Sequence, residues 1–201
     1  MLHVEGPTLT LRYATPDDVD ALLGLASDPR VTQWFSWGPY TDPAQPLAYV
    51  EGLAAKRDAG VLLDFLTVHR EHGPLGVTGL SELSSRDLRA TVGTWFGHAF
   101  WGSGANRESK ALVAALAFEH LGMNRLTAWA NVHNGRSGRA LAKAGFRHEG
   151  TLKAWHVHES GVHDVDVFAL LRDEWLTSDL REVPVTVTGD LPEAWVMPPR
   201  G

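Results

Sequence analysis

The hydrophobic pattern between residues 90 and 171 constrains the fold most, because its period switches repeatedly between that of a strand and that of a helix. The elements it predicts are strand Ala90–Phe96, helix Glu108–Leu121, strand Arg125–Val132, helix Gly135–Ala144 and a strand that begins at Phe146. The helix Glu108–Leu121 has the clearest signal, since its alanines, Phe118 and Leu121 fall on one face. This β-α-β-α-β order predicts an α/β or α+β domain.

The rest of the chain adds mostly strands. The pattern predicts strand Leu9–Tyr13, a helix from Thr15 to about Ala26, a helix at Leu47–Asp58, strands Leu62–His69 and Pro74–Leu83, and a last strand at Asp164–Leu171. The strands from Leu62 to Phe96 form an antiparallel meander. The segment Val31–Tyr40 is too aromatic for a plain linker, and we expect it to wall a pocket. One domain over residues 1–180 is therefore predicted, followed by a Pro-containing C-terminal extension over 181–201.

The composition fits one folded domain and excludes several classes of protein. The chain has 201 residues, 44% of them hydrophobic, which is enough to bury a core. A formal net charge of −6 argues against duplex nucleic acid as a partner, and the absence of Cys excludes disulfides, a thiolate nucleophile and cysteine-ligated metals. The longest apolar run, Ala111–Phe118, is far below the roughly 20 residues that span a bilayer. Met1–Leu11 lacks the basic start and apolar stretch of a secretory signal, so we expect a cytoplasmic protein that does not enter membranes.

A glycine-rich loop, Trp101–Asn106, lies between a predicted strand and the strongest helix. Its two glycines, Gly102 and Gly104, let the backbone turn sharply and present N–H groups, and the helix N-terminus adds a partial positive charge. Such a loop can hold a diphosphate. It lacks the third Gly of a dinucleotide fingerprint and the Gly-Lys-Ser/Thr ending of a P-loop, so a ligand-free strand-to-helix turn is the alternative.

A second strand-to-helix junction carries Asn134 and Ser137. Asn134 can cap the helix that follows, and Ser137 lies in its first turn. Capping explains Ser137 less well, since Glu or Gln is the usual residue there. An amide and a hydroxyl at this junction are suited to holding an amide-bearing ligand and donating a proton to it.

These motifs together resemble the GNAT acetyltransferases, especially their RimJ/RimL-like branch. The matching features, in order, are Gly102-x-Gly104, a helix, Arg125-Leu126, Asn134-x-x-Ser137 and Lys143-Ala144-Gly145-Phe146-x-x-Glu149-Gly150. The likeness extends from the opening strand at Leu9 to about residue 175. It implies a mixed, mainly antiparallel central sheet of six or seven strands, splayed at its centre and flanked by helices.

The resemblance also implies a binding site for acetyl-CoA. The backbone of Trp95, Phe96 and Gly97 would pair with pantetheine, and Asn134 and Ser137 would face the cofactor arm. The phosphates would lie on the loop formed by Trp101, Gly102, Ser103, Gly104, Ala105 and Asn106. Trp101 and Asn106 depart from the commonest family pattern, which leaves backbone binding intact and any side-chain contribution there open.

Amine acetylation needs two proton transfers and no metal. The resemblance implies that Ser137 protonates the departing thiolate. For the base that deprotonates the amine, the sequence offers Glu82, before the meander turn, or Glu149, just past Phe146, and a chain of water molecules is the alternative.

A cluster of His and Asp residues supports a rival interpretation. His156 and His158 alternate along one strand, and His163, Asp164 and Asp166 follow closely, a grouping that could bind zinc, nickel or iron. An ordinary polar strand face with a turn at 160–161 is the alternative, and no compact spacing of metal ligands is present.

The sequence thus predicts an N-acetyltransferase that moves an acetyl group from acetyl-CoA to a primary amine by direct attack in a ternary complex. A protein N-terminal α-amine, of the ribosomal-protein kind, is the expected acceptor. The alternatives are a small-molecule amine such as an antibiotic or polyamine, and a non-catalytic sensor that binds acyl-CoA. No metal, nucleic acid or membrane partner is expected, and a homodimer is the assembly considered.

Overall fold

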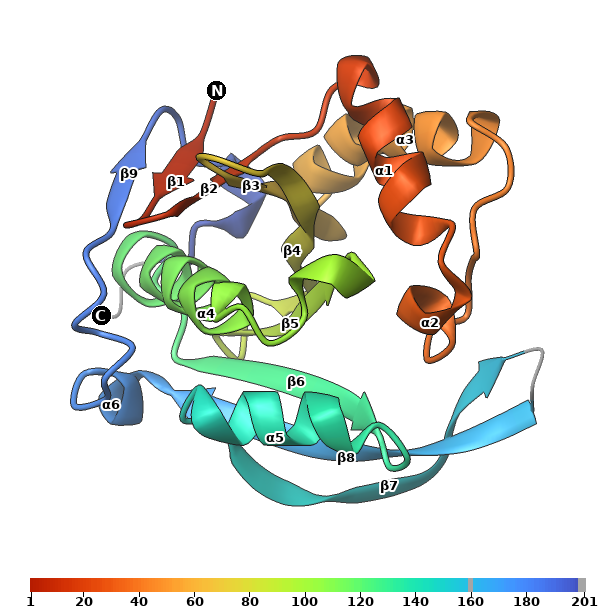
Figure 1. The fold of residues 1–201 in the computed structure, drawn as a ribbon. Helices are drawn as coiled ribbons and strands as arrows, with labels where there is room; N and C mark the ends of the chain where they lie inside the picture. Colours follow the sequence, from red (N-terminus) through yellow and green to blue (C-terminus); the bar gives the residue numbers. More distant parts are fainter. Residues whose placement is uncertain (159–160, 199–201) are drawn as a thin grey trace.

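The computed structural model describes residues 1–158 and 161–198, which form one nine-stranded sheet in the order β7-β8-β6-β5-β4-β3-β2-β1-β9 (Figure 1). The strands are β1 (His3–Glu5), β2 (Leu9–Arg12), β3 (Leu62–His69), β4 (Gly73–Ser84), β5 (Arg89–Phe96), β6 (Arg125–Asn131), β7 (Arg147–His158), β8 (Gly161–Leu171) and β9 (Thr186–Thr188). The helices are α1 (Val19–Ala26), α2 (Pro29–Thr32), α3 (Ala44–Asp58), α4 (Ala105–Ala115), α5 (Gly135–Lys143) and α6 (Arg172–Trp175). A π-helical turn at Leu116–His120 prolongs α4, and short 3-10 turns lie at Pro16–Asp18, His98–Phe100 and Glu193–Trp195.

The sheet has nine strands, so the expected count of six or seven was wrong. The two strands that the pattern did not predict are β1 and β9, of three residues each, which pair with one another at the edge of the sheet. Three residues are too few to show an alternation of period two. The mixed, mainly antiparallel character of the sheet is confirmed, since β5 and β6 are its parallel pair.

The C-terminal extension packs against the domain over its described residues. Besides supplying β9, it buries Trp195 completely and leaves Met197 6% exposed. The indole Nε1 of Trp195 donates a hydrogen bond to the backbone oxygen of Arg57 at 2.9 Å. The last three residues of the extension, 199–201, and residues 159–160 of the expected turn between β7 and β8 lie outside the described residues.

The sheet opens between β5 and β6. These strands pair from Arg89↔Arg125 to Thr91↔Thr127 and no further. Beyond that point β5 stays bonded to β4 as far as Phe96, and β6 stays bonded to β8 as far as Asn131. Each strand therefore keeps its outer neighbour while the inner edges separate, and the sheet is splayed at its centre.

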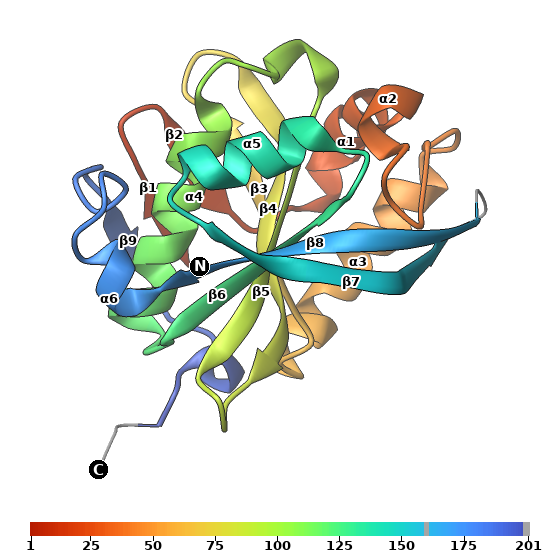
Figure 2. The ribbon, with the colours of Figure 1, turned by 90° about the horizontal axis from the view of Figure 1, so that it is seen from below.

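The two faces of the sheet carry different helices. Figure 2 shows α4 and α5 on one side and α1 and α3 on the other. Because side chains alternate along a strand, β5 sends Val92 and Phe96 into the core that contains α4, and Trp95 toward the cluster of α1 and α3. The hairpin of β7 and β8 runs beyond the end of β6 on the side of α2 (Figures 1 and 2).

Candidate active site

A cavity of about 550 Å³ occupies the opening between β5 and β6. Its lining comes from both strands, from the glycine-rich loop, from α4 and α5, and from the aromatic segment after α2. At one end the lining includes Gly102, Gly104 and Asn106, and at the other Trp34, Phe35, Trp129 and His156. The expectation that Val31–Tyr40 walls a pocket is confirmed for Val31, Trp34 and Phe35.

The glycine-rich loop has the conformation that its sequence requires. Gly102 and Gly104 have φ angles of 81° and 92°, in the left-handed region that favours glycine. A Cβ added at either position would meet no atom within 4 Å, so open space lies directly over the backbone. Among the described residues, no hydrogen bond uses the backbone N–H of Gly102, Ser103, Gly104 or Asn106. The loop therefore presents free donors at the N-terminus of α4, an arrangement that binds anions.

Cationic side chains surround the same end of the cavity. Its lining includes Arg107, Arg136, Arg139 and Lys143, the last three from α5. The guanidinium carbon of Arg136 lies 3.1 Å from the centre of the Trp101 ring, and Trp101 Nε1 donates to the backbone oxygen of Phe96 at 2.8 Å. Trp101 thus connects the end of β5 to the start of α5, a role that the sequence did not show.

The expected pantetheine segment lies where β5 has lost β6. Trp95 and Phe96 remain paired with Val77 and Gly76 of β4, and the N–H of Gly97 donates to Leu75 at 2.9 Å. Trp95 and Phe96 line the cavity, and the edge of β5 that faces it has no strand partner beyond Thr91. An extended ligand can pair with such an edge.

Asn134 and Ser137 both line the cavity at the start of α5. The Asn134 side-chain oxygen accepts a hydrogen bond from the Ser137 backbone N–H at 3.2 Å, so the cap uses the amide group of Ser137 and leaves its hydroxyl to the cavity. Asn131, which the sequence analysis did not single out, lines the same region. Its Oδ1 accepts from the N–H of His133 at 2.9 Å, while its buried Nδ2 has no partner among the described residues.

These features fit acetyl-CoA. The glycine loop leaves room for phosphates where a Cβ would intrude, and the cationic rim can balance their charge. The unpaired edge of β5 and the orphaned donor of Asn131 suit the amides and carbonyls of a pantetheine arm.

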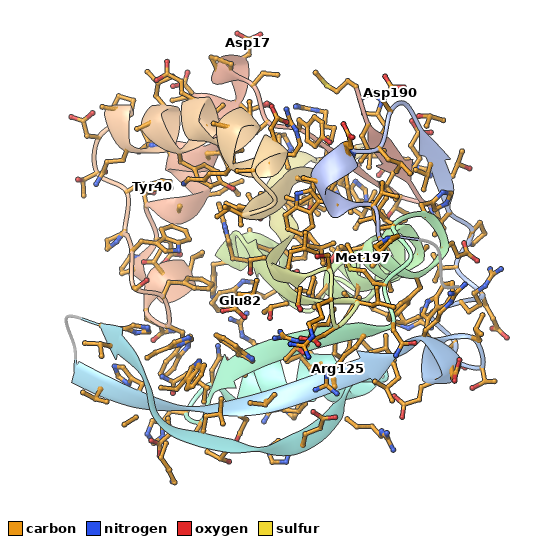
Figure 3. All side chains as sticks on the ribbon, turned by 180° about the vertical axis from the view of Figure 1, so that it is seen from behind. Asp17, Tyr40, Glu82, Arg125, Asp190 and Met197 are labelled. Carbon is orange, nitrogen blue, oxygen red and sulfur yellow. The ribbon has the colours of Figure 1, made fainter. Side chains whose placement is uncertain are left out.

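Glu82 lies where the two parallel strands part. It sits in an irregularity of β4 with a φ angle of 51°, and its Oε2 accepts a hydrogen bond at 2.7 Å from the hydroxyl of Thr91, the last β5 residue paired with β6. Glu149 lies elsewhere, bound to Arg125, and that hydrogen-bonded ion pair lowers the pKa of the Glu149 carboxyl. Figure 3 shows Glu82 over the middle of β6 and Arg125 nearer the start of the strand.

The His and Asp residues of the hairpin do not form a metal site. His156, His158 and His163 stack in a row, with ring centroids 5.7 and 4.8 Å apart. Asp164 is held by Lys153 Nζ and the N–H of Ala154, both at 2.8 Å. Asp166 accepts from Thr151 and lies 3.2 Å from His148. Over residues 1–158 and 161–198, no group of three His, Asp or Glu side chains could hold a metal ion.

His156 belongs instead to the cavity wall, with its ring centroid 5.4 Å from that of Trp129. Burial lowers the pKa of the His156 imidazole, while the Glu82 carboxylate opposes that shift. A neutral imidazole can accept a proton near pH 7. The sequence analysis treated His156 only as a metal ligand, because strand alternation does not show which face of a hairpin meets a distant strand.

Lys110 of α4 is a second cavity residue that sequence reasoning missed. It is 3% exposed, and its Nζ donates to the hydroxyl of Thr94 at 2.5 Å. Burial lowers the pKa of the Lys110 ammonium to about 7. Its only signal in the sequence is a charge directly before the apolar run Ala111–Phe118.

Comparison with known proteins identifies the family. Residues 8–147 match the family described as "Acetyltransferase (GNAT) domain". The chain belongs to the GNAT family of acetyltransferases. It is 28% identical over 168 residues to the "Uncharacterized N-acetyltransferase p20" of Bacillus licheniformis, covering 83% of this chain and 94% of that protein. A crystal structure of an acetyltransferase from T. thermophilus is 26% identical, with a TM-score of 0.76 and coverage of 87% and 91%.

GNAT membership settles the fold and the reaction class. The protein is an N-acetyltransferase that uses acetyl-CoA as co-substrate, as the resemblance implied. No helix within the described residues is long and apolar enough to cross a membrane.

Proposed function

We propose that this GNAT protein transfers an acetyl group from acetyl-CoA, held between β5 and β6, directly to a primary amine that enters from the side of Glu82 and His156. The observation that carries the proposal is the separation of β5 from β6 beyond Thr91 and Thr127, with the glycine loop at one end of the resulting cavity. When bound, acetyl-CoA supplies an activated thioester. The loop from Trp101 to Asn106 would hold its phosphates, the edge of Trp95–Gly97 its pantetheine, and Asn134 the cofactor arm.

Two side chains are placed to move the required protons. The hydroxyl of Ser137 faces the cavity and is free of the helix cap, so it can donate a proton toward the leaving sulfur. His156 lines the cavity with a lowered pKa, so its neutral ring can take the proton of the amine, and the Glu82 carboxylate favours the cation that results. This assignment makes Glu82 a positioning residue and His156 the base.

A pH profile separates this arrangement from direct deprotonation by Glu82. Because the Glu82 carboxylate raises the pKa of His156, Glu82→Gln should move the acidic limb of the kcat/KM profile to lower pH and lower its plateau. His156→Gln should remove that limb. A His156→Gln protein with an unchanged profile would show that the imidazole is not the base.

For the acceptor, we propose a protein N-terminal amine of the ribosomal-protein kind, which would place the chain in the RimJ/RimL-like branch. The relative "Putative ribosomal N-acetyltransferase YdaF" of Bacillus subtilis (strain 168) supports this assignment, at 26% identity over 83% of this chain and 93% of that protein. The aromatic end of the cavity, with Trp34, Phe35 and Trp129, supports a small cationic amine as the second candidate.

A screen of N-terminal peptides, polyamines and aminoglycosides, followed by release of free CoA, tests the proposal. Peptides with a free α-amine should give the highest kcat/KM, and N-blocked copies of the same peptides should give none. A polyamine that outperforms every peptide would favour the second candidate. Light scattering of the purified protein tests the homodimer, and proteolysis after residue 180 tests whether residues 1–180 fold as a domain without the extension.

A further inference from the structure

The buried Lys110 lies at the end of the cavity where the acyl group of the co-substrate would be, given the cofactor path of the proposed function. The path starts at the phosphate loop, follows β5 backward from Gly97 to Trp95, and ends where β5 and β6 converge at Thr91 and Thr127. Thr94, the hydrogen-bond partner of Lys110, is the next residue along this path. The helix leads to the same place, since Lys110 is five residues into α4, about 7–8 Å along the helix axis from Ala105.

Lys110 and Glu82 approach this convergence point from opposite faces of the sheet. Thr94 and Lys110 lie on the face of α4, whereas Thr91, which binds Glu82, alternates to the other face. The amine would enter on the face of Glu82. An acyl chain longer than acetyl would then extend away from the amine, toward Lys110.

The surroundings of Lys110 provide hydroxyl groups but no negative charge. The Thr94 hydroxyl continues to Thr78 at 3.3 Å, and Thr78 lies 3.2 Å from Thr67, so three strands contribute one row of hydroxyls. Burial alone accounts for the lowered pKa of Lys110, and none of the described carboxylates forms an ion pair with it. A buried lysine without a counter-charge is costly and gains a partner when an anion enters beside it.

We propose that Lys110 forms a recognition site for a carboxylate at the end of the acyl chain, so that the protein also uses CoA thioesters of dicarboxylic acids, of the malonyl or succinyl class. The reaction is the same acyl transfer. The amine nitrogen bonds to the thioester carbonyl carbon, the carbon–sulfur bond breaks, the amine proton passes to the base, and the sulfur leaves as CoA thiol. The distal carboxylate takes no part in the bond changes and pairs with the Lys110 ammonium.

Calorimetric titration with acetyl-CoA, butyryl-CoA and succinyl-CoA tests the site, because the last two have four-carbon acyl groups that differ in the carboxylate. Wild type should bind succinyl-CoA at least about tenfold more tightly than butyryl-CoA, a difference worth about 1.4 kcal/mol. Lys110→Met should abolish this preference and change acetyl-CoA affinity less than threefold, a threshold of about 0.7 kcal/mol. Thr94→Val, which removes the partner hydroxyl, should reduce the preference, and the exposed Lys56→Met on α3 should keep it.

Three results would overturn the proposal. Wild type that binds butyryl-CoA as tightly as succinyl-CoA would show that no carboxylate is recognised, and a Lys110→Met protein that keeps the preference would assign it to another group. Mass spectrometry that finds Lys110 itself acylated after incubation would show a nucleophile in place of a binding site. Wild type that binds none of the three thioesters would refute the proposed cofactor path, whereas binding of acetyl-CoA with no preference for succinyl-CoA would leave that path intact and refute only the site at Lys110.

Discussion

Replacing Lys110 with Met should change how the stability of the protein depends on pH. Burial lowers the pKa of Lys110 from 10.5 to about 7 in the folded state. Between these values the unfolded chain binds a proton that the folded chain does not, so the free energy of unfolding of wild type rises with pH. The full difference of about 3.5 pKa units corresponds to about 5 kcal/mol, at about 1.4 kcal/mol for each unit.

Only part of that difference is accessible in a convenient range. Between pH 7 and pH 9, the term from Lys110 should raise the stability of wild type by about 2 kcal/mol, and Lys110→Met lacks this term. The variant should therefore be the more stable protein at pH 7, by a margin that shrinks by about 2 kcal/mol at pH 9. Other groups titrate in both proteins and cancel in the difference.

Urea denaturation of wild type, Lys110→Met and the exposed control Lys56→Met, at pH 7, 8 and 9, measures this effect. The Lys56→Met curve should stay parallel to that of wild type. If the Lys110→Met curve were also parallel, Lys110 would carry its charge at pH 9, and the argument from burial would fail.

Three further predictions concern the cavity. Gly104→Val should weaken acetyl-CoA binding by about 1–3 kcal/mol in calorimetry, because a branched side chain at a φ of 92° fills the space over the loop, and unchanged affinity in a folded protein would refute the phosphate site. Ser137→Ala should lower kcat about 10²-fold at saturating amine with little change in Tm or acetyl-CoA affinity, because the cap uses the backbone N–H and not the hydroxyl. A kcat within about twofold of wild type, with chemistry shown to limit the rate, would rule out the acid. Dialysis against a chelator should leave acetyl transfer intact, and activity restored only by zinc would revive the cluster of His156, His158 and His163.

The sequence predicted the elements with strong periodicity and missed features set by distant contacts. Helix α4 and strands β3 to β6 were placed within a few residues, because each has several turns or alternations of its own. The glycine loop was found because a positive φ favours glycine, which leaves a visible trace at Gly102 and Gly104.

The features that were missed depend on tertiary packing. Strands β1 and β9 exist because they pair with each other across nearly the whole chain, and neither is long enough to carry a pattern. Lys110, Asn131 and His156 face the cavity only because β6 and the β7–β8 hairpin follow β5 in the sheet at some distance in sequence. Burial and an orphaned amide are properties of that arrangement, and no local pattern of residues encodes them.

A crystal structure with CoA bound tests the central claim most directly, namely that the cofactor lies between the separated strands. The account predicts that the diphosphate accepts hydrogen bonds, at roughly 2.7–3.2 Å, from backbone N–H groups of the loop Gly102–Asn106. It also predicts that the pantetheine amides pair with the free edge of β5 at Trp95–Gly97, with the sulfur near Ser137. A diphosphate bound away from this loop, or a pantetheine arm outside the opening between β5 and β6, would contradict the account.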